Sequence, residues 1–175
     1  FGGIDYRTGG QYVSYESVKG GFGARPNKDG INALSSGIAN TMNTPIEALE
    51  MSFPLRVNCY ELIPGSGGGG KFRGGLGARR AWTVLENNAR ASVCMERMRS
   101  PPFGIAGGGN GSPARATLKY PDGTQRALPS KGAFDVPAGG QVVLEAPGSG
   151  GYGDEAERDP THIVSDRKDG YLDET

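Results

Sequence analysis

The sequence predicts a mostly β protein with minor α structure (α+β): glycine-rich antiparallel hairpins, one short early helix and one C-terminal helix. Three observations predict this fold class. Glycine makes up 31 of the 175 residues and gathers in clusters between short apolar runs. From Phe53 onward, apolar and polar residues alternate with a period of two, and turn-forming residues separate these runs at short intervals. Because glycine is retained where φ is positive or where two backbones approach closely, we expect turns, bulges and tight crossings at the clusters.

The first 52 residues are expected to hold a loose strand, a glycine-rich loop and a short helix. Residues 11–19 alternate as a strand would, and residues 20–30 are rich in turn formers. Thr44 and Glu47 have the spacing of a capping box, with Pro45 at the first helical position. The helix should span about residues 45–51 and end before Pro54.

The middle of the chain is expected to be strands. The period of two places Leu55, Val57, Cys59 and Glu61 on one side of a strand, and Arg56, Asn58, Tyr60 and Leu62 on the other. Three hairpins should follow, each around a turn-forming stretch. They join residues 78–85 to 89–96 near Asn87-Asn88, residues 115–120 to 124–128 around Pro121-Asp122-Gly123, and residues 134–136 to 141–146 around residues 137–140.

The last element is expected to be a helix from Asp159-Pro160 to about Lys168. An aspartate followed by proline is a strong helix start, because the carboxylate caps the free N–H groups and proline suits the first turn. Gly170 should end the helix.

Composition and charge exclude several classes of function. Nineteen basic and nineteen acidic residues give a net charge of zero, whereas a nucleic-acid-binding domain usually has a basic excess. No apolar run approaches the 18 residues needed to cross a membrane. Cys59 and Cys94 lack metal-ligand spacing, and we expect them to be buried thiols in a reducing, cytoplasmic compartment rather than a disulfide.

The apolar fraction of 35% is low, so part of the stability is expected to come from a partner chain. The sequence starts at Phe1 rather than Met and stops after a charged run. We therefore expect it to be part of a longer polypeptide.

The stretch Gly65-Ser66-Gly67-Gly68-Gly69-Gly70-Lys71-Phe72 nearly matches a phosphate-binding loop. However, Phe72 occupies the position whose hydroxyl should bind magnesium, and the glycines that follow disfavour the required helix. We expect a structural loop with no bound cofactor. His162 is the single histidine and lies in the first turn of the last helix, which disfavours a histidine-based triad or metal site in this segment.

A group of polar residues lies around glycine turns and the first helix start: Arg25, Asp29, Asn40, Asn43, Thr44 and Glu47. Such a loop could orient a polar substrate, or it could satisfy its own backbone groups. The residue types leave both interpretations open.

Taken in order, a long set of motifs resembles the HyuB-type subunit of the hydantoinase B/5-oxoprolinase family, and the resemblance covers nearly the whole chain. These motifs are Gly20-Gly21-Phe22-Gly23-Ala24-Arg25-Pro26, Asp29-Gly30, Asn40-Thr41-Met42-Asn43-Thr44-Pro45-Ile46-Glu47, Leu55-Arg56-Val57, Tyr60-Glu61-Leu62, Ser66-Gly67-Gly68, Phe72-Arg73-Gly74-Gly75-Leu76-Gly77, Leu128-Pro129-Ser130-Lys131, Pro147-Gly148-Ser149-Gly150-Gly151-Tyr152-Gly153-Asp154 and Arg158-Asp159-Pro160.

The resemblance implies the C-terminal portion of a HyuB-like subunit, with a glycine-rich loop and short helix region (1–52), a β-rich body (53–158) and a terminal helix (159–175). It implies a hetero-oligomeric, ATP-dependent hydrolase that opens cyclic amides such as hydantoins, 5-oxoproline or lactams. The expected partners are a HyuA-like subunit that binds ATP and Mg, the remainder of the HyuB-like subunit, and a small-molecule substrate, with no nucleic acid and no membrane. Two alternatives stay open: a subunit of an acetone- or acetophenone-type carboxylase, and a non-catalytic interface segment.

The resemblance also implies a divalent metal site, with zinc as one candidate, in the N-terminal part of such subunits, whose Asp and His ligands have no counterpart here. This segment alone is therefore expected to be inactive and to bind no metal or cofactor, and its catalytic residues stay unassigned. Within the matching motifs, the expected substrate-binding residues are Arg25, Asp29, Asn40, Asn43 and Glu47.

Overall fold

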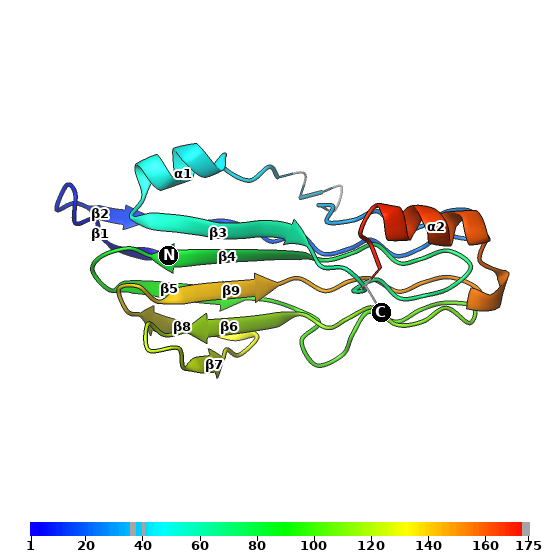
Figure 1. Cartoon of the computed structure of the whole chain (residues 1–175). Helices are drawn as coiled ribbons and strands as arrows, with labels where there is room; N and C mark the ends of the chain where they lie inside the picture. The colour runs from blue at the N-terminus through cyan, green and yellow to red at the C-terminus, as the bar shows by residue number, and fades with distance from the viewer. Residues whose placement is uncertain (36–37, 40, 173–175) are drawn as a thin grey trace.

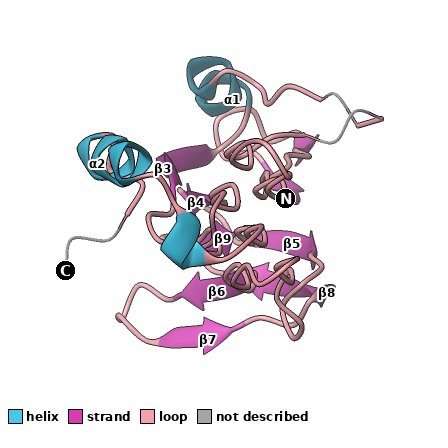
Figure 2. Ribbon diagram, turned by 90° about the vertical axis from the view of Figure 1, so that its right-hand side faces the viewer, coloured by secondary structure: helices cyan, strands magenta, loops and turns pink. Residues whose placement is uncertain are grey.

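Two antiparallel sheets packed face to face form one half of the molecule, and long glycine-rich segments form the other half (Figure 1). The computed structural model describes residues 1–35, 38–39 and 41–172. Strands dominate and two α-helices accompany them, which confirms the mostly β, α+β prediction. Figure 2 shows both helices on the β3 side of the molecule, away from β7.

The four-stranded sheet has the order β2-β1-β5-β8. Its strands are β1 (Gly2–Ile4), β2 (Gln11–Val13), β5 (Ala89–Cys94) and β8 (Lys131–Val136). The strand expected over residues 11–19 is thus shorter, and its partner β1 had no signal in the sequence. Both β1 and β2 are only three residues long, too short for periodicity to be recognised.

The five-stranded sheet has the order β3-β4-β9-β6-β7. Its strands are β3 (Leu55–Leu62), β4 (Ala78–Val84), β9 (Gln141–Glu145), β6 (Arg115–Lys119) and β7 (Gln125–Ala127). The β6–β7 hairpin is present as predicted, and Gly123 in its turn has a φ of 86°.

The other two predicted hairpins are wrong. β4 pairs with β3 and β9, whereas β5 pairs with β1 and β8, so the turn at Asn87 crosses from one sheet to the other. β8 and β9 likewise lie in different sheets. The Asn87-Asn88 pair correctly predicts a tight turn, and Asn87 has a φ of 59°. However, turn residues alone cannot distinguish a hairpin within one sheet from a corner between two packed sheets.

A β-bulge between Val57 and Cys59 also changes the predicted faces of β3. Leu55 and Val57 lie opposite Val84 and Trp82, and after the bulge Tyr60 lies opposite Arg80. An extra residue shifts the alternation by one, so Tyr60 joins the face of Leu55 instead of the face of Arg56.

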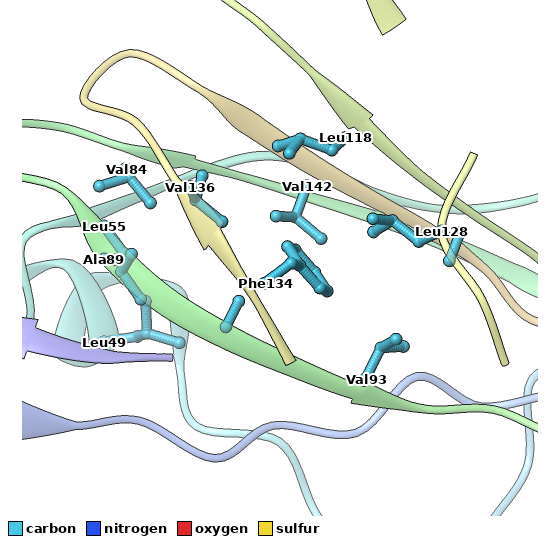
Figure 3. Packing of buried hydrophobic residues seen from close by; sticks show 12 residues of the cluster. Leu49, Leu55, Val84, Ala89, Val93, Leu118, Leu128, Phe134, Val136 and Val142 are labelled. Carbon is cyan, nitrogen blue, oxygen red and sulfur yellow. The ribbon is translucent and has the colours of Figure 1, made fainter. Parts of the chain in front are cut away.

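The core lies between the two sheets and is made mainly of small and medium aliphatic side chains, with Phe134 among them (Figure 3). Val84, Leu118 and Val142 from the five-stranded sheet meet Phe134 and Val136 from β8. Leu49 of α1 (Ile46–Ser52) closes one end and is fully buried. This contact fixes the short helix through its single buried side chain.

The predicted capping box of α1 is absent. Pro45 is the N-cap, with a ψ of 138°, and makes no side-chain cap bond. Thr44 therefore lies one residue before the cap, and Glu47 is the second helical residue instead of the third, so the reciprocal bonds cannot form. The helix is held instead at its other end, where the Arg7 guanidinium donates to the backbone oxygens of Glu50 (3.2 Å) and Met51 (3.1 Å).

The second helix, α2 (Pro160–Lys168), follows a short 3₁₀ turn, η1 (Glu155–Glu157), and has the predicted ends. The Asp159 carboxylate accepts the backbone N–H of Thr161 at 2.8 Å, and Gly170 has a φ of 69°. His162 is exposed in its first turn.

The glycine-rich half is a bundle of extended backbones in direct contact. A methyl group placed on Gly74 would overlap the carbonyl oxygen of Ser149, and one on Gly148 would overlap that of Ser66, both well inside 3.0 Å. The same holds for glycines throughout this half: Gly21, Gly67, Gly68, Gly75, Gly77, Gly104, Gly108, Gly111, Gly150 and Gly151. No other residue fits where main chain lies against main chain. We call residues 20–34, 65–77, 102–112 and 147–153 the glycine bundle.

Hydrogen bonds leave the central segment of the glycine bundle, residues 147–153, in three directions. Ser149 accepts from Gly68 (2.8 Å), Gly150 accepts from Ala24 (3.0 Å), and Gly151 donates to Gly109 (3.0 Å). A strand in a sheet has only two neighbours. Because residues 147–153 bond to three neighbouring segments, the bundle packs in two dimensions instead of as a sheet.

We predict that Gly74→Ala destabilises the fold by about 3 kcal/mol or more, because the clash is with backbone atoms that cannot rotate away. Gly23→Ala is the matched control in the same bundle, since its Cβ would lie 3.7 Å from the nearest heavy atom, the Ser149 hydroxyl. Urea unfolding of both variants measures the difference. Equal midpoints would show that the close packing contributes nothing.

Candidate functional site

A network of two arginines and two aspartates joins α2 to the glycine bundle. The Arg158 guanidinium binds the Asp29 carboxylate with both terminal nitrogens, at 2.9 and 3.0 Å. Its Nη2 also donates to Asp166 of α2 at 2.6 Å. Because the two Nη groups present a planar fork, one arginine can hold both carboxylates in fixed positions.

Arg73 completes this network from the bundle side. Its guanidinium donates to both oxygens of Asp166 at 3.3 and 3.4 Å, and to the backbone oxygen of Gly74 at 2.8 Å. Its backbone N–H donates to Asp29 at 2.6 Å. The ring of Tyr171 covers the guanidinium at 5.1 Å, so the charge is shielded from water.

The two positive charges of this network are matched by two negative charges. Arg73, Arg158 and Asp166 have side chains at most 8% exposed, and Asp29 is 27% exposed. Burial by itself would raise the pKa of the Asp29 carboxyl, but the hydrogen bonds from Arg158 and from the Arg73 backbone hold that pKa below its usual value. Both carboxylates are therefore occupied by guanidinium groups, and the role of the network is to clamp α2 to the bundle.

The network does not suit a metal ion. Metal-binding carboxylates need free oxygens, whereas those of Asp29 and Asp166 already bind guanidinium groups. In the part of the chain that the structure describes, no three His, Cys, Asp or Glu residues gather closely enough to hold an ion.

A second line of polar side chains lies within the sandwich and centres on Arg80 of β4. Arg80 of β4 is fully buried, and its Nη1 donates to the Glu16 carboxylate at 2.6 Å. The rings of Tyr60 and Trp82 lie 5.0 and 4.9 Å from the guanidinium carbon. The bulge in β3 makes this arrangement possible, because it turns Tyr60 toward Arg80.

This second line reaches the surface through Asn43. The Asn43 amide donates to the Tyr60 hydroxyl at 2.9 Å and accepts from the Ser17 hydroxyl at 3.2 Å. Among the described residues, Nε and Nη2 of Arg80 have no hydrogen-bond partner. Asn43 and Tyr60 are therefore the stronger candidate for a binding surface, with the fully buried Arg80 behind them.

The structure separates the four predicted site residues that it describes. Asp29 belongs to the clamp on α2, and Asn43 belongs to the line toward Arg80. Arg25 is exposed in a tight turn, where its backbone bonds to Lys28, and Glu47 is exposed on the first turn of α1. Asn40 lies outside the described residues. The substrate-binding role of all five stays a prediction.

Sequence reasoning missed the buried arginines. Arg73, Arg80 and Arg158 are the centres of the two networks, yet none was predicted to be a site residue. One usable signal existed, because Arg73 stands among glycines and Arg80 among apolar strand residues, where a charged side chain must find a buried partner. Glu16, Asp166 and Asp29 lie 64, 93 and 129 residues from Arg80, Arg73 and Arg158, so spacing alone could not identify these pairs.

The cysteines are free, as predicted, but neither is fully buried: Cys59 is half-buried, and Cys94 is exposed. Its side chain lies on the outer face of β5, which alternates strictly between buried and exposed positions. No helix among the described residues is long and apolar enough to span a membrane.

Comparison with known proteins agrees with the motif resemblance. The family model for hydantoinase B/oxoprolinase matches residues 1–155. The chain belongs to this family. A protein from Pseudomonas sp. (strain NS671), named as the B component of a D-/L-hydantoinase, is 34% identical over 163 residues, which is 92% of this chain and 27% of that protein.

Solved structures of similar proteins show the same fold. The crystal structure of an ATP-dependent caprolactamase from Pseudomonas jessenii superposes with a TM-score of 0.86 at 30% identity, over 98% of this chain and 31% of that chain. An acetone carboxylase in a nucleotide-free structure superposes with a TM-score of 0.76 at 19% identity, over 98% of this chain and 27% of that chain. The chain thus spans about a third or less of the length of these relatives.

We predict that Asp166→Ala lowers the free energy of unfolding by about 3–5 kcal/mol, because it leaves the buried Arg73 guanidinium without its carboxylate partner and Arg158 with Asp29 alone. Asp135→Ala is the matched control, since Asp135 pairs with Arg90 at 3.0 Å but both side chains are more than 60% exposed. That variant should change stability by less than about 1 kcal/mol. Equal losses in urea unfolding would contradict a special role for the buried clamp.

Proposed function

We propose that this chain is part of a subunit of an ATP-dependent amidohydrolase that opens cyclic amides of the hydantoin, 5-oxoproline or lactam type. The observation that carries the proposal is its similarity over 98% of its length to an ATP-dependent caprolactamase, at 30% identity. The acetone carboxylase, at 19% identity, shares the fold but supports no statement about the reaction.

The proposed chemistry explains why two kinds of subunit would share the work. A ring amide is a poor electrophile, and ATP supplies the phosphoryl group that would activate its oxygen on a HyuA-like partner. The activated amide must then be kept from bulk water until it is correctly placed. A divalent metal, proposed for the remainder of a HyuB-like subunit, finds no fitting ligands in the part of this chain that the structure describes.

This chain's contribution in the proposal is positioning. The glycine bundle is held by backbone hydrogen bonds in several directions, so the side chains mounted on it cannot shift independently. Outside the bundle, Asn43 before α1 and Tyr60 on β3 present an amide and a hydroxyl at the surface, which could orient a polar ring substrate where two subunits meet. The alternative of a purely structural interface segment makes the same contacts but predicts no effect of these groups on turnover.

Assays of the purified native complex test the proposed reaction. We expect ATP turnover that depends on hydantoin, 5-oxoproline or caprolactam, because each offers an amide oxygen to activate. Acetophenone with bicarbonate is the control for carboxylation. ATP turnover only with the ketone and bicarbonate would reject the amidohydrolase and favour the carboxylase.

Two substitutions test the predicted site residues in the assembled enzyme. We expect Asn43→Ala and Arg25→Ala to lower kcat/KM about tenfold or more, roughly 1.4 kcal/mol, while melting temperature and complex formation stay nearly unchanged. The controls are Asn58→Ala, which removes a similar bond to Thr83 (2.8 Å) on the same strand β3 as Tyr60, and Lys28→Ala in the turn of Arg25. Unchanged turnover in the Asn43→Ala and Arg25→Ala variants would show that these two residues have only a structural role.

A further inference from the structure

A groove of about 460 Å³ lies beside the four-stranded sheet, between β5 and the residues that follow β2. One wall is residues 13–18, which continue from β2, and the other is residues 92–95 at the end of β5. Phe1 and Gly2 close one end of it. We call this space the β1 groove, because Phe1 and Gly2, where β1 begins, line it.

The β1 groove lies in line with β1, between the residues that follow β2 and the second half of β5. β1 lies between β2 and β5, but it pairs with β5 only at Gly2↔Arg90 and Gly3↔Ala89. β5 runs on to Cys94, and on its other side it remains paired with β8 through Lys131. Beyond Arg90, the side of β5 that faces β1 therefore has no neighbour among the described residues.

Both walls of the groove carry backbone groups that can receive a strand. Phe1 and Ser14 form a pair of mutual bonds, with Phe1 N donating to Ser14 O at 2.9 Å and Ser14 N donating to Phe1 O at 2.7 Å. In an antiparallel ladder such pairs recur every second residue, so the next would fall at Glu16 and Val18. Within the described residues, 15–18 make no backbone–backbone hydrogen bond.

The same reasoning applies to β5. The Met95 amide donates to Ser130 at 2.7 Å, on the side of β8, so the amides of Ser92 and Cys94 point the other way, into the groove. A strand in the register of β1 would pair with Ser92 and Cys94 on one side and with Glu16 and Val18 on the other. Four residues, about 13 Å of extended chain, would reach all four.

The backbone nitrogen of Phe1 already takes part in the ladder, because it donates to Ser14 in the position of an ordinary ladder N–H. The Phe1 ring already packs on Trp82, with ring centroids 5.8 Å apart, on the inner face of the sandwich. The relatives compared above have two-thirds or more of their length outside the matched stretch.

From these observations we infer that the β1 groove accepts four residues of extended polypeptide joined directly to Phe1, which lengthen β1 and complete the four-stranded sheet. Because Phe1 points inward, the second and fourth residues before it also point inward, and the first and third point outward beside Ser92 and Cys94. The occupant is thus expected to be apolar at its second and fourth positions before Phe1.

A disulfide tests the register. We would extend the 175-residue chain as Val-Cys-Val-Thr before Phe1, in a Cys59→Ser background, so that the new cysteine lies opposite Cys94. Directly opposed residues of a bonded pair have Cα atoms about 5.5 Å apart, within the range of a disulfide. The control extension, Val-Thr-Cys-Thr, places the cysteine on the inner face. With oxidised glutathione we expect the first chain to link to Cys94 at least tenfold faster than the control, as measured by peptide mass. No link, or equal rates for the two, would overturn the inference.

Hydrogen exchange tests the occupancy without cysteine chemistry. An extension Val-Thr-Val-Thr should slow exchange of the Glu16, Val18, Ser92 and Cys94 amides tenfold or more, relative to the 175-residue chain. Proline in place of both threonines removes the donors toward β5, and should abolish the protection. Unchanged exchange with the first extension would overturn the inference. Protection by the separate peptide Val-Thr-Val-Thr-Phe, with none in the extended chain, would assign the groove to another molecule and also overturn it.

Discussion

Contact between bare backbones is the constraint on which the rest of this structure depends. In the glycine bundle, main chain lies against main chain at distances that exclude even a methyl group, as at Gly74 and Gly148. The peptide groups so buried must find hydrogen-bond partners, and they do so among three neighbouring segments instead of two. A small apolar core is therefore sufficient for a chain of this length, because half of the molecule is held mainly by backbone hydrogen bonds.

The buried arginines are positioned by this bundle and by the sandwich next to it. Arg73 stands between glycines of the bundle, and its partners Asp29 and Asp166 bring a loop and α2 onto the same surface. Arg80 holds Glu16 against the sandwich, and so fixes one wall of the β1 groove. For a component of the proposed amidohydrolase, such a frame can hold surface groups like Asn43 and Tyr60 in constant positions at a boundary with other polypeptide.

The sequence predicts those parts of the fold that depend on local chemistry. The Asp159-Pro160 start of α2, the β6–β7 hairpin, the strand from Leu55 and the glycine close approaches are all confirmed. The wrong predictions concern features that depend on long-range packing. The turns at Asn87 and at residues 137–140 join different sheets, and a bulge turned Tyr60 to the opposite face of β3. Among the candidate site residues, Asp29 and Asn43 were named without their partners, because Arg158 and Tyr60 meet them only through the folded bundle and the bulge.

Native-state hydrogen exchange of the bundle glycines tests this account most directly. If backbone packing is the foundation of the fold, the amides of Gly74 and Gly151 open only when the whole chain unfolds. Their free energies of opening should then equal those of the central β4 amides, such as Trp82, and should match the free energy of unfolding in urea. Exchange of the Gly74 and Gly151 amides at rates near those of an unstructured chain, while Trp82 stays protected, would contradict the account.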